Sequence, residues 1–217
     1  MMGGLEGLGG GVTELDEPTM GRPERQWGRT ARTRENILEA ALEIFLAQGY
    51  ADTAVAQVVE RSGSSVGSIY HHFGGKAELY LSLYERHQNA YVEAVAKAVR
   101  RARSAGEEDL VELFLVGSRA FLETAWKNRA PARMFLTGDG PPGFPTMQRR
   151  GMKDWIRQNA QLLKIPDNPA NRVKITVLTG MIDSGTREVT STESRREAKL
   201  FVEATLRLVR AVTVTDV

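Results

Sequence analysis

The stretch SGSSVGSIYHHFGGKAELY, residues 62–80, carries most of what this 217-residue chain reveals about its role. Three interpretations compete for it. The glycine–glycine–lysine near its end is similar to a phosphate-binding loop, and the two adjacent histidines are of a residue type that binds metals. The whole stretch is also similar to the second half of a helix-turn-helix, whose short helix enters DNA. The surrounding residues discriminate among the three.

Neither glycine pattern of the chain meets the requirements of a nucleotide-binding loop. A phosphate loop needs a glycine five positions before its second glycine and a hydroxyl after its lysine, and the chain has Tyr70 and Ala77 there. Residues 138–143, GDGPPG, match a dinucleotide-binding fingerprint in letters alone. That fingerprint opens a helix, which Pro141 and Pro142 prevent, and no strand is expected before it. We therefore expect no nucleotide cofactor.

The histidines do not form a metal site on this pattern. His71 and His72 are neighbours on an expected helix, so their side chains diverge by about 100° and cannot share one ion. His87 is the only other histidine, and the chain has no cysteine. No nucleophile, base and orienting group occur together in a recognised motif. The sequence therefore predicts no metal, no cofactor and no enzymatic activity.

The helix-turn-helix interpretation explains more residues. Short helices are expected over residues 54–61 and 65–73, with Asp52 or Thr53 capping the first, and a Ser-Gly-Ser turn joins them. In the second helix Ile69 and Phe73 share an inward face. Its outward face, which would meet the major groove, holds the residues Ser65, Val66, Ser68 and His71. Gly67 would let the phosphate backbone come close, and Tyr70 and Lys76 are of types that bond phosphates.

Composition narrows the class of protein. The absence of cysteine excludes disulfides, and no run approaches the roughly 18 apolar residues that a membrane span needs. The formal net charge of +2 is too small to indicate nucleic-acid binding, so the distribution of charge matters more. Arginines gather just before the first helix of the helix-turn-helix unit, at Arg22, Arg25, Arg29, Arg32 and Arg34. We expect a cytoplasmic protein with a basic arm beside its DNA-binding helices.

The whole chain is expected to be all-α, with about nine helices and no strand. Apolar residues recur at helical spacing after about residue 32, and nowhere with the period of two that strands show. The first 28 residues are glycine-rich and lack this periodicity, so they are expected to be a disordered leader, with Met20 as a candidate start. We assign residues 29–76 to a helix-turn-helix domain and residues 77–217 to a helical domain for effector binding and dimerisation.

Residues 33–84 resemble the DNA-binding domain of the TetR family of bacterial transcriptional regulators. The segments that carry the resemblance are ILEAALEIFLAQGY, DTAVAQVVERSG, SSVGSIYHHF and GGKAELY. The resemblance implies that positions used against DNA, or in supporting it, are Thr53, Ser65, Gly67, Ser68, Tyr70, His71, His72 and Lys76. Val66 departs from the polar residue frequent in the family, which places a methyl group where thymine could be met. Arg32 completes the predicted DNA-binding set from the basic arm.

The resemblance also implies a homodimer and a cavity for a small molecule in the C-terminal half. Independently, the last two expected helices, residues 168–190 and 194–212, are apolar over more of their surface than one intramolecular contact requires. An aromatic and methionine-rich middle suits an apolar or aromatic effector. The predicted ligand-binding residues are Phe114, Phe121, Trp126, Met134, Phe135, Met147, Met152, Trp155 and Met181.

These features favour a repressor that binds a palindromic operator in double-stranded DNA as a homodimer and is released by a small molecule. Two alternatives stay open on the sequence. The chain could be an all-helical enzyme or small-molecule carrier that retains a helix-turn-helix, or a transcriptional activator.

Overall fold

The computed structural model describes the backbone of residues 23–215 and the side chains of residues 30–215. Within this range the chain forms nine helices and no strand, which confirms the predicted all-α fold. The helices are α1 (Pro23–Gln48), α2 (Val55–Ser62), α3 (Val66–Phe73), α4 (Lys76–Ser104), α5 (Leu110–Lys127), α6 (Arg129–Leu136), α7 (Phe144–Leu162), α8 (Pro169–Ser191) and α9 (Arg195–Thr213).

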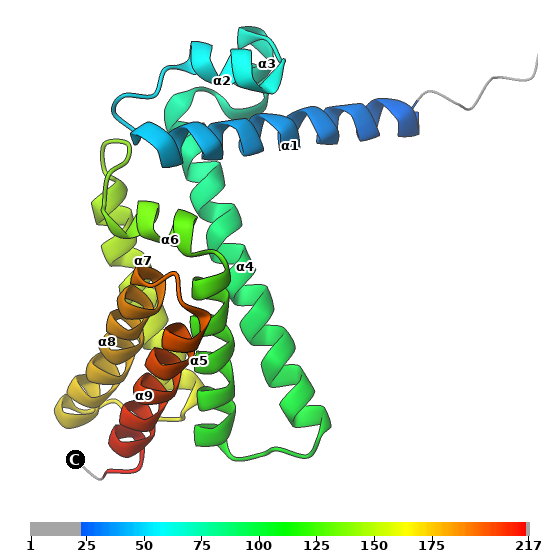
Figure 1. Cartoon of the computed structure of the whole chain (residues 1–217). Helices are drawn as coiled ribbons and strands as arrows, with labels where there is room; N and C mark the ends of the chain where they lie inside the picture. Colours follow the sequence, from blue (N-terminus) through cyan, green and yellow to red (C-terminus); the bar gives the residue numbers. More distant parts are fainter. Residues whose placement is uncertain (1–22, 216–217) are drawn as a thin grey trace, which may run out of the picture.

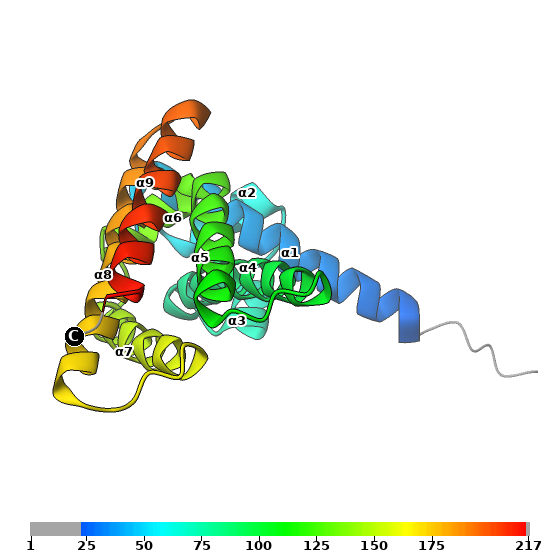
Figure 2. The same ribbon diagram turned by 90° about the horizontal axis from the view of Figure 1, so that it is seen from below.

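The helices form two groups joined by α4. In Figure 1, α1, α2 and α3 lie at one end of the molecule, and α4 runs from beside them past α6 to the far end. Helix α5 packs along α4, and α8 and α9 pack against α5 and against each other. Seen from below in Figure 2, α8 and α9 lie side by side on the side away from the projecting end of α1.

Helix α1 begins earlier than the sequence predicts. Residues 23–28 were expected in a disordered leader, but the helix starts at Pro23, and proline is well tolerated in a first helical turn. This end of α1 projects beyond α2 and α3 in Figure 1. A helical segment with no core to face needs no apolar stripe, which is why periodicity missed it. The rest of the predicted leader, with Met20 and Arg22, lies outside the described residues.

Several helices begin at a residue whose side chain caps the first turn. Ser65 accepts a hydrogen bond from the Ser68 backbone N–H at 3.1 Å, and Asn168 accepts one from the Asn171 backbone N–H at 2.9 Å. The expected cap of α2 was wrong. Ala54 occupies that position, and its backbone N–H donates to Gln57 Oε1 at 2.7 Å.

Two hydrophobic cores hold the molecule together. The first lies under α1, α2 and α3 and includes residues from the start of α4, such as Leu79 and Tyr80. It also includes Phe135 from α6 and Phe144 from α7, which come from much later in the chain. The second core is formed by α5, α8 and α9. The end of the molecule formed by α1, α2 and α3 is therefore completed by residues from the other half.

Candidate nucleic-acid interface and internal cavity

Helix α3 has one face anchored in the first core and one face open to solvent. Ile69 is fully buried and Phe73 nearly so, one turn apart on the inner face. Val66 and Tyr70 are 51% and 55% exposed on the outer face. A helix of eight residues fixed at two buried positions presents its outer side chains in a defined direction. Such a rigid presentation is what readout of base edges requires.

The predicted base-reading residues gather on this outer face. Ser65, Val66, Gly67, Tyr70 and His71 are exposed, whereas Ser68 and His72 are half-buried. Among these, Gly67 is informative because a Cβ atom there would meet only Ser65 Oγ, at 3.8 Å. The chain itself thus has no packing reason for glycine, which weakens a helix by roughly 0.5–1 kcal/mol relative to alanine. Room for a close approach by another molecule is a reason that fits this position.

The connection from α3 to α4 uses backbone angles that favour glycine. Gly74 ends α3 with a φ of 92°, and Gly75 precedes α4 with a φ of 151°. Side chains other than glycine rarely adopt these angles. The two glycines therefore permit the sharp change of direction between the exposed helix and the long helix that leads to the second core.

Lys76 has a different place from the one predicted. Its Nζ donates to three backbone carbonyl oxygens, those of Tyr50 at 2.8 Å, Ala51 at 3.2 Å and Thr53 at 2.8 Å. An ammonium group has three hydrogens to donate, so none remains for a phosphate. The ammonium also lies 4.4 Å from the centre of the Tyr50 ring. Lys76 thus holds the turn between α1 and α2, and its predicted direct phosphate contact is not supported.

Thr53 is likewise structural. It is nearly fully buried, and its hydroxyl donates to the Gly49 carbonyl oxygen at 2.7 Å, so its side chain cannot reach a ligand outside. Arg32 on α1 is exposed, in keeping with a backbone contact. The described residues contain no group of three or more side chains suited to hold a metal ion, and His71 and His72 pack ring against ring at 5.1 Å.

A cavity of about 760 Å³ lies between α4, α5, α6, α7 and α8. Five of the nine predicted ligand-binding residues line it, namely Phe121, Phe135, Met147, Met152 and Trp155. This volume suits a drug-sized molecule. The helices that form the cavity walls also pack against the first core through Phe135.

The other four predicted ligand-binding residues do not line the cavity. Phe114 is buried in the second core, and Met181 and Trp126 pack against that core. Met134 packs against the first core. Apolar and aromatic types serve equally in a core and in a cavity, so residue type alone did not separate the two uses.

Three residues on α4 line the cavity although they are not among the predicted ligand-binding residues. Tyr84, His87 and Tyr91 line the cavity and are spaced three and four apart, so they share one helical face. That spacing was visible in the sequence. His87 is only 8% exposed, and burial lowers the pKa of its imidazole to about 4. The side chain of His87 is therefore a buried, neutral imidazole at the cavity.

The loop between α6 and α7 joins the cavity walls to the DNA-binding end. Asp139 Oδ2 accepts a hydrogen bond from the Tyr50 backbone N–H at 2.8 Å. The Tyr80 hydroxyl donates to the Asp139 carbonyl oxygen at 2.6 Å. The loop therefore contacts both the end of α1 and the start of α4.

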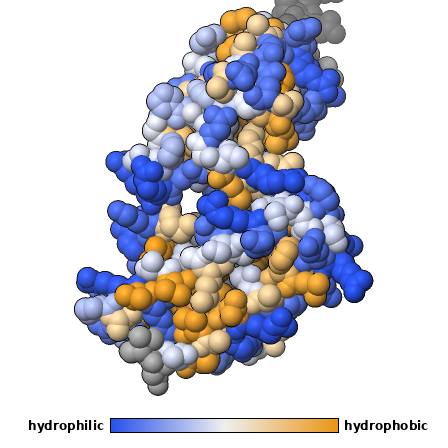
Figure 3. All heavy atoms as spheres, turned by 60° about the vertical axis from the view of Figure 1, so that its left-hand side comes forward, coloured by the Kyte–Doolittle hydropathy of each residue, from blue (hydrophilic) through white to orange (hydrophobic). Residues whose placement is uncertain are grey.

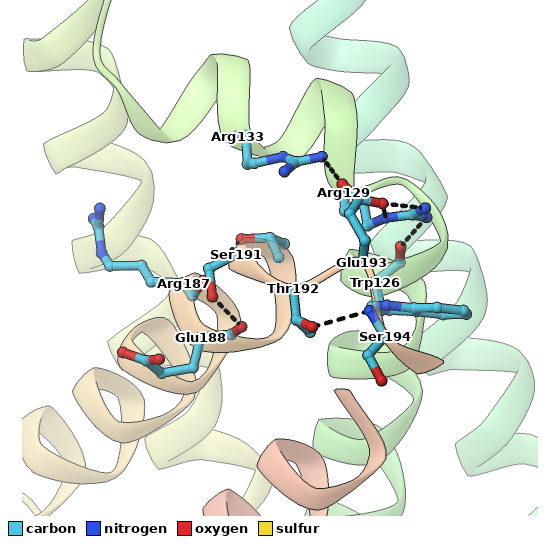
Figure 4. A network of polar contacts seen from close by, with 10 residues as sticks. Trp126, Arg129, Arg133, Arg187, Glu188, Ser191, Thr192, Glu193 and Ser194 are labelled. Atoms are coloured by element: carbon cyan, nitrogen blue, oxygen red, sulfur yellow. Dashed lines mark hydrogen bonds and ion pairs between the residues drawn. The ribbon is translucent and has the colours of Figure 1, made fainter. Parts of the chain in front are cut away.

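A second polar network ties α6 to the junction of α8 and α9. Glu193 lies between Arg129 and Arg133 in Figure 4, with ion-pair distances of 2.6 Å to each. Trp126 lies beside this network, and its indole N–H is buried without a hydrogen-bond partner. Helix α6 is therefore held at the α8–α9 side by ion pairs and at the DNA-binding side by Phe135.

The arrangement defines a class of protein: an all-helical protein with an N-terminal helix-turn-helix and a cavity in its C-terminal half. Residues 37–83 match the family model of bacterial regulatory proteins, tetR family. This part of the chain is therefore similar to the DNA-binding region of TetR-family regulators. No helix in the described part of the chain is both long and apolar enough to span a membrane.

Several curated relatives are similar to the first third of the chain. The transcriptional regulator SrpR of Pseudomonas putida is 39% identical over 57 residues, which cover 26% of this chain and 27% of SrpR. The transcriptional activator FasR of Mycolicibacterium smegmatis is 37% identical over 67 residues, 31% of each chain. The transcriptional repressor AcnR of Corynebacterium efficiens is 35% identical over 85 residues, 39% of this chain and 40% of AcnR. The matches thus span between about a quarter and two fifths of these relatives.

Solved structures share the fold of nearly the whole chain. A TetR-family regulator from Syntrophomonas wolfei has a TM-score of 0.69 at 14% identity, covering 86% of this chain and 97% of that one. A TetR-like regulator from Rhodococcus sp. RHA1 has a TM-score of 0.64 at 19% identity, covering 83% and 93%. The SmeT–triclosan complex has a TM-score of 0.59 at 19% identity, covering 82% and 91%. At these identities the similarity concerns the fold alone.

Proposed function

We propose that this protein is a transcriptional regulator that binds a palindromic operator as a homodimer and is released from DNA by a small molecule. The observation that carries the proposal is α3, a short helix with a buried inner face and an open outer face, in a segment that matches the TetR-family model. Repression is the primary expectation, and activation is the alternative, since the curated relatives include both a repressor and an activator. Such a regulator acts in the cytoplasm, where bacterial DNA lies.

The outer face of α3 reads base edges in this proposal. Ser68 and His71 offer hydrogen-bonding groups for bases, and Val66 offers a methyl group for thymine. Tyr70 and Arg32 bond phosphates, which position the protein without reading sequence. Lys76 supports this surface indirectly, by holding the turn before α2.

The dimer forms through α8 and α9. Apolar side chains on these helices are exposed among the described residues, with Val177 42%, Leu200 62% and Leu208 59% exposed. Gly180, on α8, has open space around its Cα. Figure 3 brings the left-hand side of Figure 1, where α8 lies, to the front. Apolar residues, coloured orange, gather on the lower part of this face. Two such pairs of helices make a four-helix interface of the kind that symmetric dimers use.

A double substitution tests this interface. Leu200→Glu with Leu208→Glu places charge on the proposed contact, so we expect monomers in analytical ultracentrifugation and loss of operator binding. The control is Leu46→Glu, which changes an exposed leucine on α1, away from α8 and α9, and should leave the dimer intact. A double variant that stays dimeric would assign the interface to another surface.

Effector binding is proposed to act through α4 and the loop at residues 137–143. A molecule in the cavity meets the face of α4 that carries Tyr84 and Tyr91, and α4 begins beside α3. The recognition helices of a dimer must lie about 34–36 Å apart to enter successive major grooves, so a shift of a few ångströms loses one half-site. The loop contacts of Asp139 with Tyr50 and Tyr80 provide a second connection to the same end.

The deciding experiment measures DNA binding. Fluorescence anisotropy with DNA from upstream of the protein's own gene should show saturable, sequence-selective binding. Complete absence of binding at low salt would favour the enzyme or carrier alternative instead. Any ligand that raises the melting temperature should then weaken operator binding, and the operator should weaken ligand binding by the same factor. In Asp139→Ala we expect ligand and operator to weaken each other's binding by a smaller factor.

A further inference from the structure

The cavity contains several polar groups that are already satisfied within the protein. The hydroxyls of Thr179 and Thr186 donate to carbonyl oxygens one turn earlier on α8, at 2.9 and 2.7 Å. Gln148 Nε2 donates to the Phe135 carbonyl oxygen at 2.8 Å. These groups have no need of a ligand.

His87 and Tyr91 differ from them. Both line the cavity, one turn apart on α4, and they are 8% and 4% exposed. Neither side chain makes a hydrogen bond within the described part of the chain, although their rings contact each other at 4.7 Å. Because the buried imidazole stays neutral near pH 7, it keeps one acceptor nitrogen beside its donor. The polar atoms of this pair are not sealed inside the protein and open onto the cavity, where a bound molecule can replace water as their hydrogen-bond partner.

The walls next to this pair are aromatic. The rings of Tyr91 and Phe121 stack at 4.3 Å, and Phe121 meets Trp155 edge to face at 4.7 Å. Phe135 lies 5.1 Å from the imidazole of His87. Rings from α4, α5, α6 and α7 therefore converge on the cavity. Such a wall suits a planar aromatic molecule, which gains edge-to-face and stacking contacts.

The charges that line the cavity disfavour a cation. Asp183 is paired with Arg187 at 3.3 Å, and Asp154 is paired with Arg157. Arg149 and Arg150 also line the cavity, with no carboxylate within salt-bridge distance. The lining therefore carries a net positive charge, and a positively charged ligand would meet repulsion there.

We propose that the cavity takes an aromatic molecule that carries a hydroxyl group of the phenol type and no positive charge, held by His87 and Tyr91. The hydroxyl donates to the acceptor nitrogen of His87 and accepts from the Tyr91 hydroxyl, while the ring system lies against Phe121, Phe135 and Trp155. This inference rests on the proposed function, in which the cavity is the effector site. It adds the chemical class of the ligand and the two residues that determine specificity.

Matched probes test the proposal by isothermal titration calorimetry on the full chain. The probes are 2-naphthol, 2-methylnaphthalene, which replaces the hydroxyl with a methyl group, and the 2-naphthylmethylammonium ion. 2-Methylnaphthalene is measured by displacement of 2-naphthol. We expect the protein to bind 2-naphthol at least about tenfold more tightly than the other two, because a site with unpaired polar groups rejects analogues that lack the matching group.

Three variants assign the preference to residues. His87→Phe and Tyr91→Phe keep a ring in place, so each should lower the preference for 2-naphthol while 2-methylnaphthalene binding is kept. Tyr70→Phe is the matched control, because it removes the same hydroxyl from the outer face of α3, outside the cavity, and it should keep the full preference. Urea unfolding of each variant checks that it folds.

Three outcomes would overturn the proposal. They are equal affinities for 2-naphthol and 2-methylnaphthalene, a preference that survives in both His87→Phe and Tyr91→Phe, and no detectable binding of 2-naphthol. Operator binding is measured without any probe. Its failure would therefore refute the regulator function, whereas probe failure with intact operator binding would refute only the ligand class.

Discussion

Helix α3 and the cavity are built in opposite ways. The surface that α3 presents comes from nine consecutive residues, 65–73, and is oriented by a serine cap and two buried side chains of the same segment. The cavity takes its lining from five helices, and its lining residues run from Tyr84 to Arg187. The DNA-facing surface is thus specified locally, and the ligand-facing surface only by the packing of distant segments.

This difference has a physical consequence for how the two sites respond to change. A single substitution on the outer face of α3 alters the contacts of one residue, because its neighbours are fixed independently. A change in the cavity alters the packing of several helices at once, since well-packed interiors transmit strain. The cavity is therefore suited to sensing a ligand. Helix α3 is suited to keeping its own structure while the whole helix is displaced. The following predictions probe the comparison, from the largest expected effect to the smallest.

The largest effect is expected when a substitution on the inner face of α3 is compared with one on its outer face. Ile69→Ala removes a fully buried side chain, so the free energy of unfolding should fall by about 2–5 kcal/mol in urea titrations. Val66→Ala, on the outer face, should change it by no more than about 0.5 kcal/mol. Equal losses from both substitutions would show that α3 does not have an inner and an outer face in solution.

The second effect concerns the cavity and pH. Because burial lowers the pKa of His87 to about 4, the unfolded chain binds a proton at this residue before the folded chain does, near pH 6.5. The stability is therefore highest above pH 6.5 and falls by up to about 3 kcal/mol as the pH drops to about 4.

His87→Phe isolates this contribution from the other titrating groups. The difference in unfolding free energy between the wild type and the variant should change between pH 6.5 and 4 and stay level above pH 7. A difference that is constant over the whole range would mean that His87 titrates normally and is not held away from water.

The third prediction distinguishes a structural role of Lys76 from a direct contact of Lys76 with DNA. Lys76→Met removes three charge-assisted hydrogen bonds, so we expect a loss of stability of about 1.5–3 kcal/mol and weaker operator binding. The salt dependence of binding should keep its slope, because no phosphate contact is lost. Lys97→Met, on an exposed part of α4, is the control. If the slope of log affinity against log salt concentration became shallower by about one unit while stability stayed unchanged, Lys76 would contact a phosphate directly, as the sequence predicted.

The smallest effect is expected from one hydroxyl on the outer face. Tyr70→Phe should weaken binding by about 1 kcal/mol, roughly fivefold, on operator and unrelated DNA alike, because phosphate contacts carry no sequence information. Substitutions of Ser68 or His71 should instead change which operator bases are tolerated. If Tyr70→Phe weakened only operator binding, Tyr70 would belong with the base-reading residues.

The sequence predicted what local patterns determine. The spacing of Ile69 and Phe73 placed α3 correctly, because helical periodicity acts within a few residues. The role of Lys76 was not predictable, since it depends on three carbonyl groups that turn toward it from more than twenty residues earlier.

Cavity residues were harder to predict because a cavity and a core use the same side chains. Trp126 and Trp155 looked equivalent in the sequence, yet only Trp155 lines the cavity. The distinction depends on how α5, α7 and α8 pack, which no short segment encodes. His87 was overlooked for the opposite reason, since a single histidine on a helix is most often a surface or packing residue.

The presence of Phe135 and Phe144 in the first core bears on how this protein could be recombined with its relatives. A chimera that joined its helix-turn-helix domain to the effector domain of another regulator would remove both rings and Tyr80 from the core that holds Phe45, together with the loop that bonds to Tyr50. The grafted helices would then face a gap in their hydrophobic core. An exchange of operator specificity is easier to engineer by replacing the outer residues of α3 alone, which leaves every buried contact between the two halves in place.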